Sequence, residues 1–133
     1  MSDYCLLHTK FISHADVEHY YCAADLVVLP YKKIYQSGVL VMTLSYGKPA
    51  LVSDLPSLKE VVMDMQTAFL FESENPTALA EKLNLILVDS EKLEKVRING
   101  EELIKTKHDW NEIGRQTKQV YQSLYYQQKI IFL

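Results

Sequence analysis

The sequence predicts an α/β fold, with a parallel sheet of about four strands flanked by helices and a tail of three more helices. Apolar runs typical of strands alternate with helical patterns up to residue 74, and only helical patterns follow. With 133 residues, 48% of them hydrophobic and 23% charged, the chain has the size and composition of one globular domain. We divide it into a sheet region over residues 4–74 and a helical tail over residues 75–128.

The first elements are short. Residues 5–12 are expected to form a strand, and residues 15–24 a helix whose cap lies between Ser13 and Asp16. Residues 25–30 (DLVVLP) form the next strand. Its apolar run has no polar alternation, which is typical of a strand covered on both faces, as in a parallel sheet.

Two more strands and a helix complete the sheet region. The strands are expected over residues 49–52 and 67–71, and the helix over residues 56–62. Ser57 and Glu60 have the spacing of a capping box at the start of that helix. Strands that alternate with helices at this spacing indicate a doubly wound sheet.

Three helices are expected after the last strand. Asn75 followed by Pro76 is a typical start for the first, and Asp109 and Glu112 have capping-box spacing at the start of the third. Each helix carries an apolar stripe, and the stripes are Leu79, Leu83 and Ile86; Leu93, Val96, Gly100 and Leu103; and Trp110, Ile113, Thr117, Val120 and Leu124. Three helices are more than a small sheet needs for cover, so we expect the tail to pack on another body.

Composition limits the classes of partner. The formal net charge is −3 and the pI about 5.8, which does not favour binding to nucleic acid. Cys5 and Cys22 do not make a disulfide framework, and the first residues lack the apolar run of a signal peptide. The longest apolar run is too short to span a bilayer, so we expect no transmembrane segment and a cytoplasmic location.

The helix that begins at Gln36-Ser37-Gly38 is the best candidate for a binding site. Unpaired amides and a partial positive charge at a helix N-terminus suit a diphosphate, and glycine lets a phosphate approach the backbone. The alternative is that Gly38 serves a tight turn or a buried helix crossing that needs a small residue. Without other information, the Ser-Gly pair favours this structural explanation over phosphate binding. Lys32 and Lys33 are either cations for the same ligand or a solvated pair in a loop.

No catalytic nucleophile, general base or metal site is predicted. His19 and Cys22 are three residues apart on a helix, but zinc needs three or four convergent ligands, and His14 lies in the preceding loop. A surface helix with incidental polar residues is the better interpretation. We therefore expect no metal and no cofactor.

Four ordered segments between Leu6 and Tyr125 carry a family resemblance: FISHADVEHYYCAADLVVLPY, QSGVLVMTLSYGKPALVSDLPSLKEVV, NPTALAEKLNLIL and HDWNEIGRQTKQVYQSLY. They are similar to the aspartate-initiated strand ending in Pro-Tyr, the donor-binding helix with its Gly-x-Pro turn, the following helices and the Trp-containing final helix of one family. The chain thus resembles the C-terminal domain of group 1 (family 4) glycosyltransferases, which are retaining enzymes of GT-B architecture.

The resemblance implies a nucleotide-sugar donor, held mainly by this domain, with the acceptor held by an N-terminal domain. The chain is too short to contain that domain or the first strand–helix units of its own, so residues 1–133 resemble a partial donor-binding domain. It would need the missing N-terminal domain, or another chain, for activity. The residues implied for the donor diphosphate and sugar are Lys33, Tyr35, Gln36, Ser37, Gly38 and Val39.

One departure from the family concerns two glutamates that most members carry eight positions apart, one near the sugar and one at the ribose. Those positions here are Tyr35 and Thr43, which places the chain in a Gln-Ser-Gly subgroup and leaves Thr43 at the ribose position. A threonine offers the ribose one hydroxyl, where a glutamate accepts two hydrogen bonds. In retaining transfer of this kind the donor's own phosphate assists, and the protein positions the diphosphate.

Two hypotheses on function follow. In the first, the chain is the donor-binding part of a glycosyltransferase that acts on a glycan, lipid or other acceptor, in polysaccharide or cell-surface glycan biosynthesis. The chain alone is expected to be inactive, and the full-length enzyme to be cytoplasmic, either free or peripheral to the inner face of the membrane. In the second, it is a non-catalytic module that assembles with a partner, or with its own copies through an exposed sheet edge.

Overall fold

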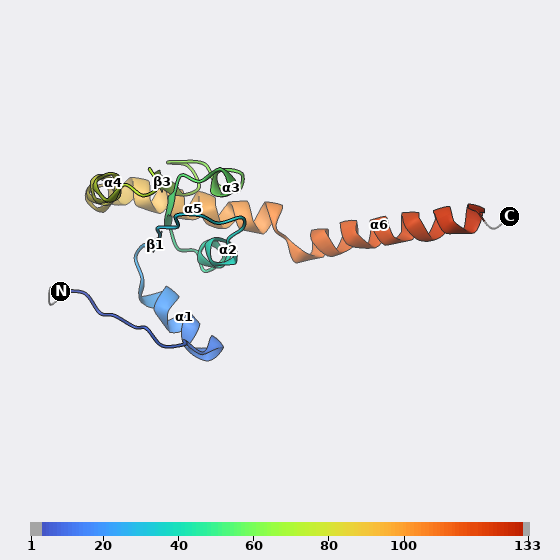
Figure 1. Cartoon of the computed structure of the whole chain (residues 1–133), viewed down its shortest axis with the longest axis horizontal. Helices are drawn as coiled ribbons and strands as arrows, with labels where there is room; N and C mark the ends of the chain where they lie inside the picture. Colours follow the sequence, from blue (N-terminus) through green and yellow to red (C-terminus); the bar gives the residue numbers. More distant parts are fainter. Residues whose placement is uncertain (1–3, 132–133) are drawn as a thin grey trace.

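In the part of the chain that the structure describes, a parallel sheet of three strands forms the centre (Figure 1). The computed structural model describes residues 4–131, and the side chains of residues 4–125. The strands are β1 (Val27–Leu29), β2 (Ala50–Ser53) and β3 (Phe69–Phe71), in the order β1-β2-β3. All pairing is parallel, so the carboxyl ends of the strands meet at one edge of the sheet.

Helices separate and follow the strands, which confirms the predicted α/β class. Their bounds are α1 (His14–Ala23), α2 (Gly38–Ser45), α3 (Pro56–Lys59), α4 (Pro76–Val88), α5 (Ser90–Lys107) and α6 (Trp110–Ile131). α2 and α3 come within the crossovers between parallel strands, as the sequence predicts, although α3 is one turn long and ends before the expected residue 62.

Both faces of the sheet are buried, as the apolar run of β1 predicts. On one face Leu29, Val52 and Leu70 join Leu40 and Leu44 of α2 in a single cluster. The other face holds a second cluster, made of Leu51, Phe69, Phe71, Ile86 and Val96, with Leu79 and Leu83 of α4 packed against it. Alternate residues of each strand therefore contribute to opposite clusters.

The predicted strand over residues 5–12 is wrong. Among the described residues, β1 pairs with β2 alone, and its other edge carries no strand. Leu6 and Phe11 are 91% and 86% exposed, so burial does not hold this segment against the sheet. It runs instead beside α1, where His8 Nδ1 lies 2.7 Å from the Tyr20 hydroxyl. A strand forms where a neighbour satisfies its amides and carbonyls, and here that neighbour is lacking.

Two predicted helix starts are confirmed. Ser37 is the N-cap of α2, and its Oγ accepts a hydrogen bond from the Leu40 amide at 3.1 Å. Asn75 is the N-cap of α4, with Pro76 at the first turn, and its Oδ1 accepts from the Ala78 amide at 3.0 Å. Both caps satisfy a donor that the helix leaves unpaired.

Two predicted capping boxes are wrong. The N-cap of α3 is Leu55, not Ser57, and Glu60 stands at the other end of the helix as its C-cap. Glu112 binds the Arg115 guanidinium rather than turning back to the start of α6. Asp109 nevertheless caps the start of α6, because its Oδ1 accepts a hydrogen bond from the Asn111 amide at 3.0 Å.

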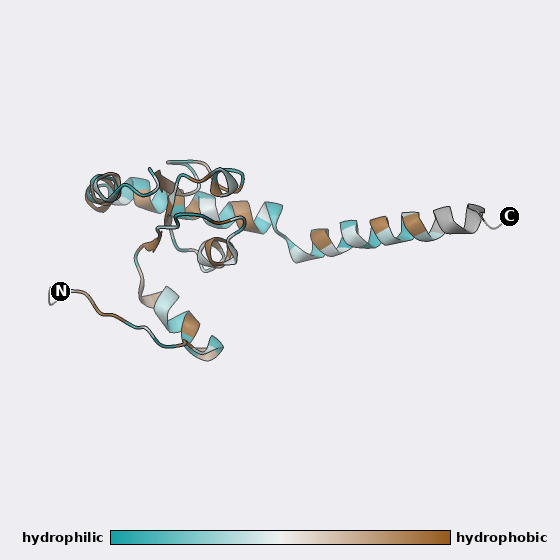
Figure 2. Cartoon of the chain, viewed as in Figure 1, coloured by the Kyte–Doolittle hydropathy of each residue, from teal (hydrophilic) through white to brown (hydrophobic). Residues whose placement is uncertain are grey.

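The helices from residue 75 onward do not form one separate tail. α4 packs on β3 and α5 packs on α2 and α4, so both cover the sheet. α6 alone extends away from the rest of the molecule, with apolar bands along its length (Figures 1 and 2). Trp110, Val120 and Leu124 of its predicted stripe are 83%, 59% and 53% exposed.

Two glycines fix how α2 sits against α5. Gly47 ends α2 in the left-handed region, with φ of 61°, where glycine avoids a steric penalty. Gly100 of α5 is buried, and a Cβ there would lie 2.7 Å from the Thr67 carbonyl oxygen and 2.9 Å from Leu44 Cδ2. The close approach of α5 to α2 therefore depends on the absence of a side chain at residue 100.

Candidate functional site

The candidate site is the start of α2, at the carboxyl end of β1. The loop from Pro30 to Ser37 leads from the strand to the helix. Gln36 near its end and Gly38, the first residue of α2, are exposed. Ser37 Oγ accepts from Leu40, which leaves the amides of Gly38 and Val39 as donors without an intrahelical acceptor. Ligands of open α/β sheets bind at this edge, so the position is suited to an anion.

The surroundings of Gly38 separate the two explanations given for the Ser-Gly pair. A Cβ at Gly38 would have no heavy atom within 4 Å, and its φ lies outside the left-handed region. A buried crossing would place neighbouring atoms there, as it does at Gly100, and a tight turn would require a positive φ, as at Gly47. Neither structural reason for a glycine applies at Gly38.

The other residues predicted for the donor surround this helix start. Gln36 and Val39 are exposed, and Ser37 is half-buried. Tyr35 is 82% exposed, and the Lys33 ammonium stands over its ring, 5.8 Å from the centroid. The contact places a positive charge over Tyr35, three residues before the first residue of α2, and at an exposed site it contributes roughly 0.5–1 kcal/mol.

Lys32 points elsewhere. Its Nζ lies 3.5 Å from Glu74 Oε1, across the sheet edge in the loop between β3 and α4. The two neighbouring lysines therefore have different partners, with Lys33 over the Tyr35 ring and Lys32 paired to the Glu74 carboxylate.

Two serines hold the loop that precedes α2. Ser57 Oγ donates to the Ile34 carbonyl at 2.7 Å, and Ser73 Oγ donates to the Tyr31 carbonyl at 3.2 Å. Neither role is predictable from the sequence, because a serine that binds a backbone carbonyl far along the chain leaves no local pattern. These bonds position the loop without occupying the amides of Gly38 and Val39.

Asp54, the residue after β2, contacts both Ser73 in the loop after β3 and Lys59 of α3. Its Oδ1 accepts from the Ser73 amide at 3.0 Å, and its Oδ2 binds the Lys59 ammonium at 3.1 Å. The Ser73 amide first, and then Lys59, hold the pKa of the Asp54 carboxyl below its usual value. Glu60 is exposed at the end of α3.

Thr43 does not present a hydroxyl at the surface. The residue has no exposed area, and its Oγ1 donates to the Val39 carbonyl at 2.7 Å within α2. Its position therefore does not support the predicted contact with a ribose. The helical spacing to Leu40 and Leu44, which face the core, is the signal that could have revealed this burial.

Other ligand types have little support in the part of the chain that the structure describes. His14, His19 and Cys22 are exposed, and residues 4–131 contain no group of three His, Cys, Asp or Glu side chains placed to hold a metal. Within that range no helix has the length and hydropathy that crossing a bilayer requires.

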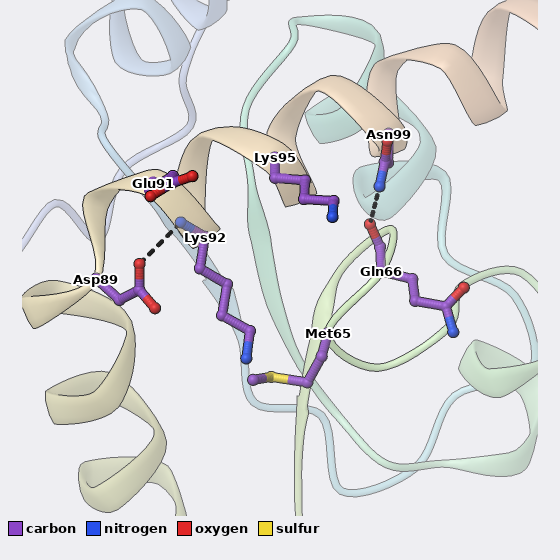
Figure 3. Close-up of a pocket in the computed structure, with 7 residues that line it drawn as sticks. All are labelled: Met65, Gln66, Asp89, Glu91, Lys92, Lys95 and Asn99. Atoms are coloured by element: carbon purple, nitrogen blue, oxygen red, sulfur yellow. Dashed lines mark hydrogen bonds between the residues drawn. The ribbon is translucent and has the colours of Figure 1, made fainter.

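A pocket of about 510 Å³ lies at the opposite edge of the sheet, between the turn before β3 and the first half of α5 (Figure 3). Lys92 extends toward Met65 there, and the Asn99 side chain donates to the Gln66 carbonyl at 3.1 Å. Asp89 and Glu91 balance the formal charges of Lys92 and Lys95 among the lining residues. It also lies at the amino end of β3, away from the edge where open sheets bind ligands.

Comparison with known proteins identifies the class. Residues 6–103, well over half of the chain, match the family of glycosyl transferases group 1. The chain belongs to this family, and its parallel sheet flanked by helices matches the glycosyltransferase fold.

Individual relatives agree with the family. The chain is 25% identical over 113 residues to an uncharacterized glycosyltransferase of Methanocaldococcus jannaschii, covering 84% of this chain and 28% of the relative. It is similar to sucrose-phosphate synthase from Thermosynechococcus elongatus, with 27% identity, a TM-score of 0.79, and coverage of 86% and 29%. Anabaena HepE, solved with UDP, matches with a TM-score of 0.77 and 22% identity, over 83% and 30%. The chain therefore spans less than a third of the length of these relatives.

Proposed function

We propose that this chain binds the diphosphate of a nucleotide-sugar donor at the start of α2, as part of a glycosyltransferase. The observation that carries the proposal is Gly38, a glycine that neither packing nor backbone conformation requires, next to two free amides. A phosphate could approach those amides closely because no side chain stands in the way.

The surrounding charges support the same ligand. Lys33 stands at the helix start, and the family's carboxylate position is occupied by the uncharged Tyr35, which does not repel phosphate. The Ser37 hydroxyl accepts from Leu40 and still has its own proton to donate to a phosphate oxygen. We place the chain in a Gln-Ser-Gly subgroup that lacks both glutamates, with backbone amides as the main contacts to the diphosphate. Thr43 takes no part, because its hydroxyl is buried.

In the whole enzyme the transfer retains the configuration of the sugar, with the departing diphosphate stabilised at the α2 start. The acceptor is a glycan, a lipid or another hydroxyl compound, held by parts that this chain does not contain. The reaction serves polysaccharide or cell-surface glycan biosynthesis at the cytoplasmic side of the membrane.

Isothermal titration calorimetry with UDP, GDP and their sugars tests the proposal, with uridine and guanosine as controls that lack phosphate. We expect dissociation constants in the micromolar to millimolar range, which corresponds to about 4–8 kcal/mol, and no heat from the nucleosides. HepE, which shares the fold, was solved with UDP, so UDP is the first choice of ligand. If no nucleotide binds at millimolar concentration, the proposal fails.

A second function is favoured by the open edge of β1. An apolar groove of about 880 Å³ lies there, between the segment that begins at Leu6, α1 and the strand, and Val27, Val28 and Met42 contribute to its lining. An unpaired edge beside apolar side chains favours pairing with another chain, which would make this a module for assembly. Sedimentation at several concentrations checks this alternative: a dimer supports it, and a monomer throughout excludes self-assembly.

A further inference from the structure

The helix α6 carries a face of apolar side chains that the rest of the described chain leaves exposed. It extends away from the sheet and from the other helices (Figures 1 and 2). On this face Trp110 is 83% exposed, Tyr121 71% and Val120 59%. Contiguous exposed apolar surface of this kind marks an interaction site in a globular protein. The face of α6 is therefore a surface for a partner.

The spacing of the apolar residues is that of a seam between two helices. They follow one another at intervals of three, four, three and four residues, and they are Trp110, Ile113, Thr117, Val120 and Leu124. Alternating intervals of three and four keep one stripe facing a second helix along a coiled coil. Thr117 fits the stripe, because its hydroxyl already donates to the Ile113 carbonyl at 2.8 Å. The partner that matches this stripe is another helix.

The charges of α6 are placed so that two identical copies can meet. Between residues 110 and 125 the charged side chains are Glu112, Arg115 and Lys118, at the outer positions of the seven-residue repeat. Glu112 Oε1 and Arg115 Nη2 lie 2.6 Å apart on that outer side. The positions that flank the stripe are uncharged: Gly114, Gln116, Tyr121 and Ser123. Flanking charges decide which helices pair, so no like-charge repulsion opposes pairing of α6 with itself.

The area of the stripe suits a weak dimer. A buried aromatic side chain covers roughly 150–250 Å², so Trp110 and Tyr121, with the aliphatic residues between them, give one helix face about 500 Å². Two such faces bury about 1,000 Å², which is the lower limit for a specific interface. The dissociation constant expected for this small interface is about 1–100 μM.

We propose that α6 is a dimerisation helix, which pairs along its length with α6 of a second copy of this chain. Because α6 projects from the body, a second helix can lie along it without meeting the sheet (Figure 1). The interface is separate from the open edge of β1 and from the α2 start, so it does not depend on the proposed donor site.

The test combines sedimentation velocity with tryptophan fluorescence, both measured from about 1 to 500 μM chain. Trp110 is the single tryptophan of the sequence and lies on the stripe, so its emission reports on this interface. We expect monomers at the lowest concentration and dimers at the highest. The emission should move to shorter wavelengths over the same range, because pairing removes the indole from water.

Two neighbouring substitutions locate the interface. Val120→Glu places a charge in the stripe and should weaken the dimer about tenfold or more. Val120 is exposed in the single chain, so the variant should keep the natural circular dichroism spectrum. Gln119→Glu adds the same charge at the next residue, on the outer side of α6, and is the matched control that should dimerise as the natural chain does.

Each alternative outcome contradicts the proposal. A chain that stays monomeric at every concentration excludes the dimer and assigns the stripe to parts of the enzyme that this chain does not contain. A dimer with unchanged Trp110 emission places the contact elsewhere, as at the edge of β1. Equal dimerisation of Val120→Glu and Gln119→Glu excludes the stripe as the interface. Neither measurement involves UDP, so failure here is distinct from failure of the donor site.

Discussion

Replacement of Gly38 by alanine separates binding from folding at the α2 start. In the free protein the new Cβ would meet no heavy atom within 4 Å, so no clash opposes it. Alanine is favoured over glycine in helices by about 0.5–1 kcal/mol, and by less in the first turn. The unfolding midpoint of Gly38→Ala should therefore stay unchanged or rise by up to about 4 °C.

Binding should respond in the opposite direction. The Cβ stands where a phosphate would approach the amides of Gly38 and Val39, and we expect the loss of one charge-assisted hydrogen bond. Such a bond contributes roughly 1.5–3 kcal/mol, which weakens UDP binding about 10- to 100-fold.

Calorimetry with UDP, together with thermal unfolding followed by circular dichroism, measures both effects on the same variant. Gly114→Ala is the matched control, because a Cβ at Gly114 on α6 also meets nothing within 4 Å. The reasoning is refuted if folded Gly38→Ala binds UDP as tightly as the natural chain. A loss of stability would equally refute it, because the glycine would then have a structural role.

Three further predictions concern packing, the buried threonine and pH. Gly100→Ala should destabilise the fold by about 1–3 kcal/mol, because its Cβ meets the Thr67 carbonyl at 2.7 Å, whereas Gly114→Ala should not; equal denaturation midpoints would contradict the close α2–α5 contact. Thr43→Val should bind UDP within about twofold of the natural chain, since the buried hydroxyl donates to the Val39 carbonyl. A tenfold loss of UDP affinity would instead support the predicted contact between Thr43 and the ribose. The pKa of Asp54 is lowered in the folded state, so its stabilisation is present above about pH 4 and lost as pH falls further. Urea titrations across this range should show a weaker acid dependence for Asp54→Asn, and an unchanged dependence would exclude Asp54 as a contributor.

Local patterns allowed much of the fold to be predicted. The apolar runs located all three strands, and Ser37 and Asn75 marked the starts of α2 and α4, because a cap acts on amides within its own turn. The strand predicted over residues 5–12 was wrong because strand formation depends on more than a local pattern. Their apolar pattern is typical of a strand, but a strand also needs a neighbouring edge, which is a property of the assembled sheet.

The candidate site divides in the same way. The sequence and the family resemblance located the helix start at Gln36-Ser37-Gly38, but they did not reveal whether packing requires the glycine. The bonds from Ser57 and Ser73 to the loop join residues that are distant in the chain. Such contacts depend on how strands and loops meet at the sheet edge, so no spacing in the sequence predicts them.

The central claim is that the first turn of α2 binds a diphosphate through its backbone amides. Amide chemical shifts of the ¹⁵N-labelled chain, recorded during separate titrations with UDP and with uridine, test it most directly. The largest shifts are expected at Gly38 and Val39 with UDP, and uridine should leave both amides unchanged. Unshifted amides at saturating UDP, or equal shifts with uridine, would contradict the claim.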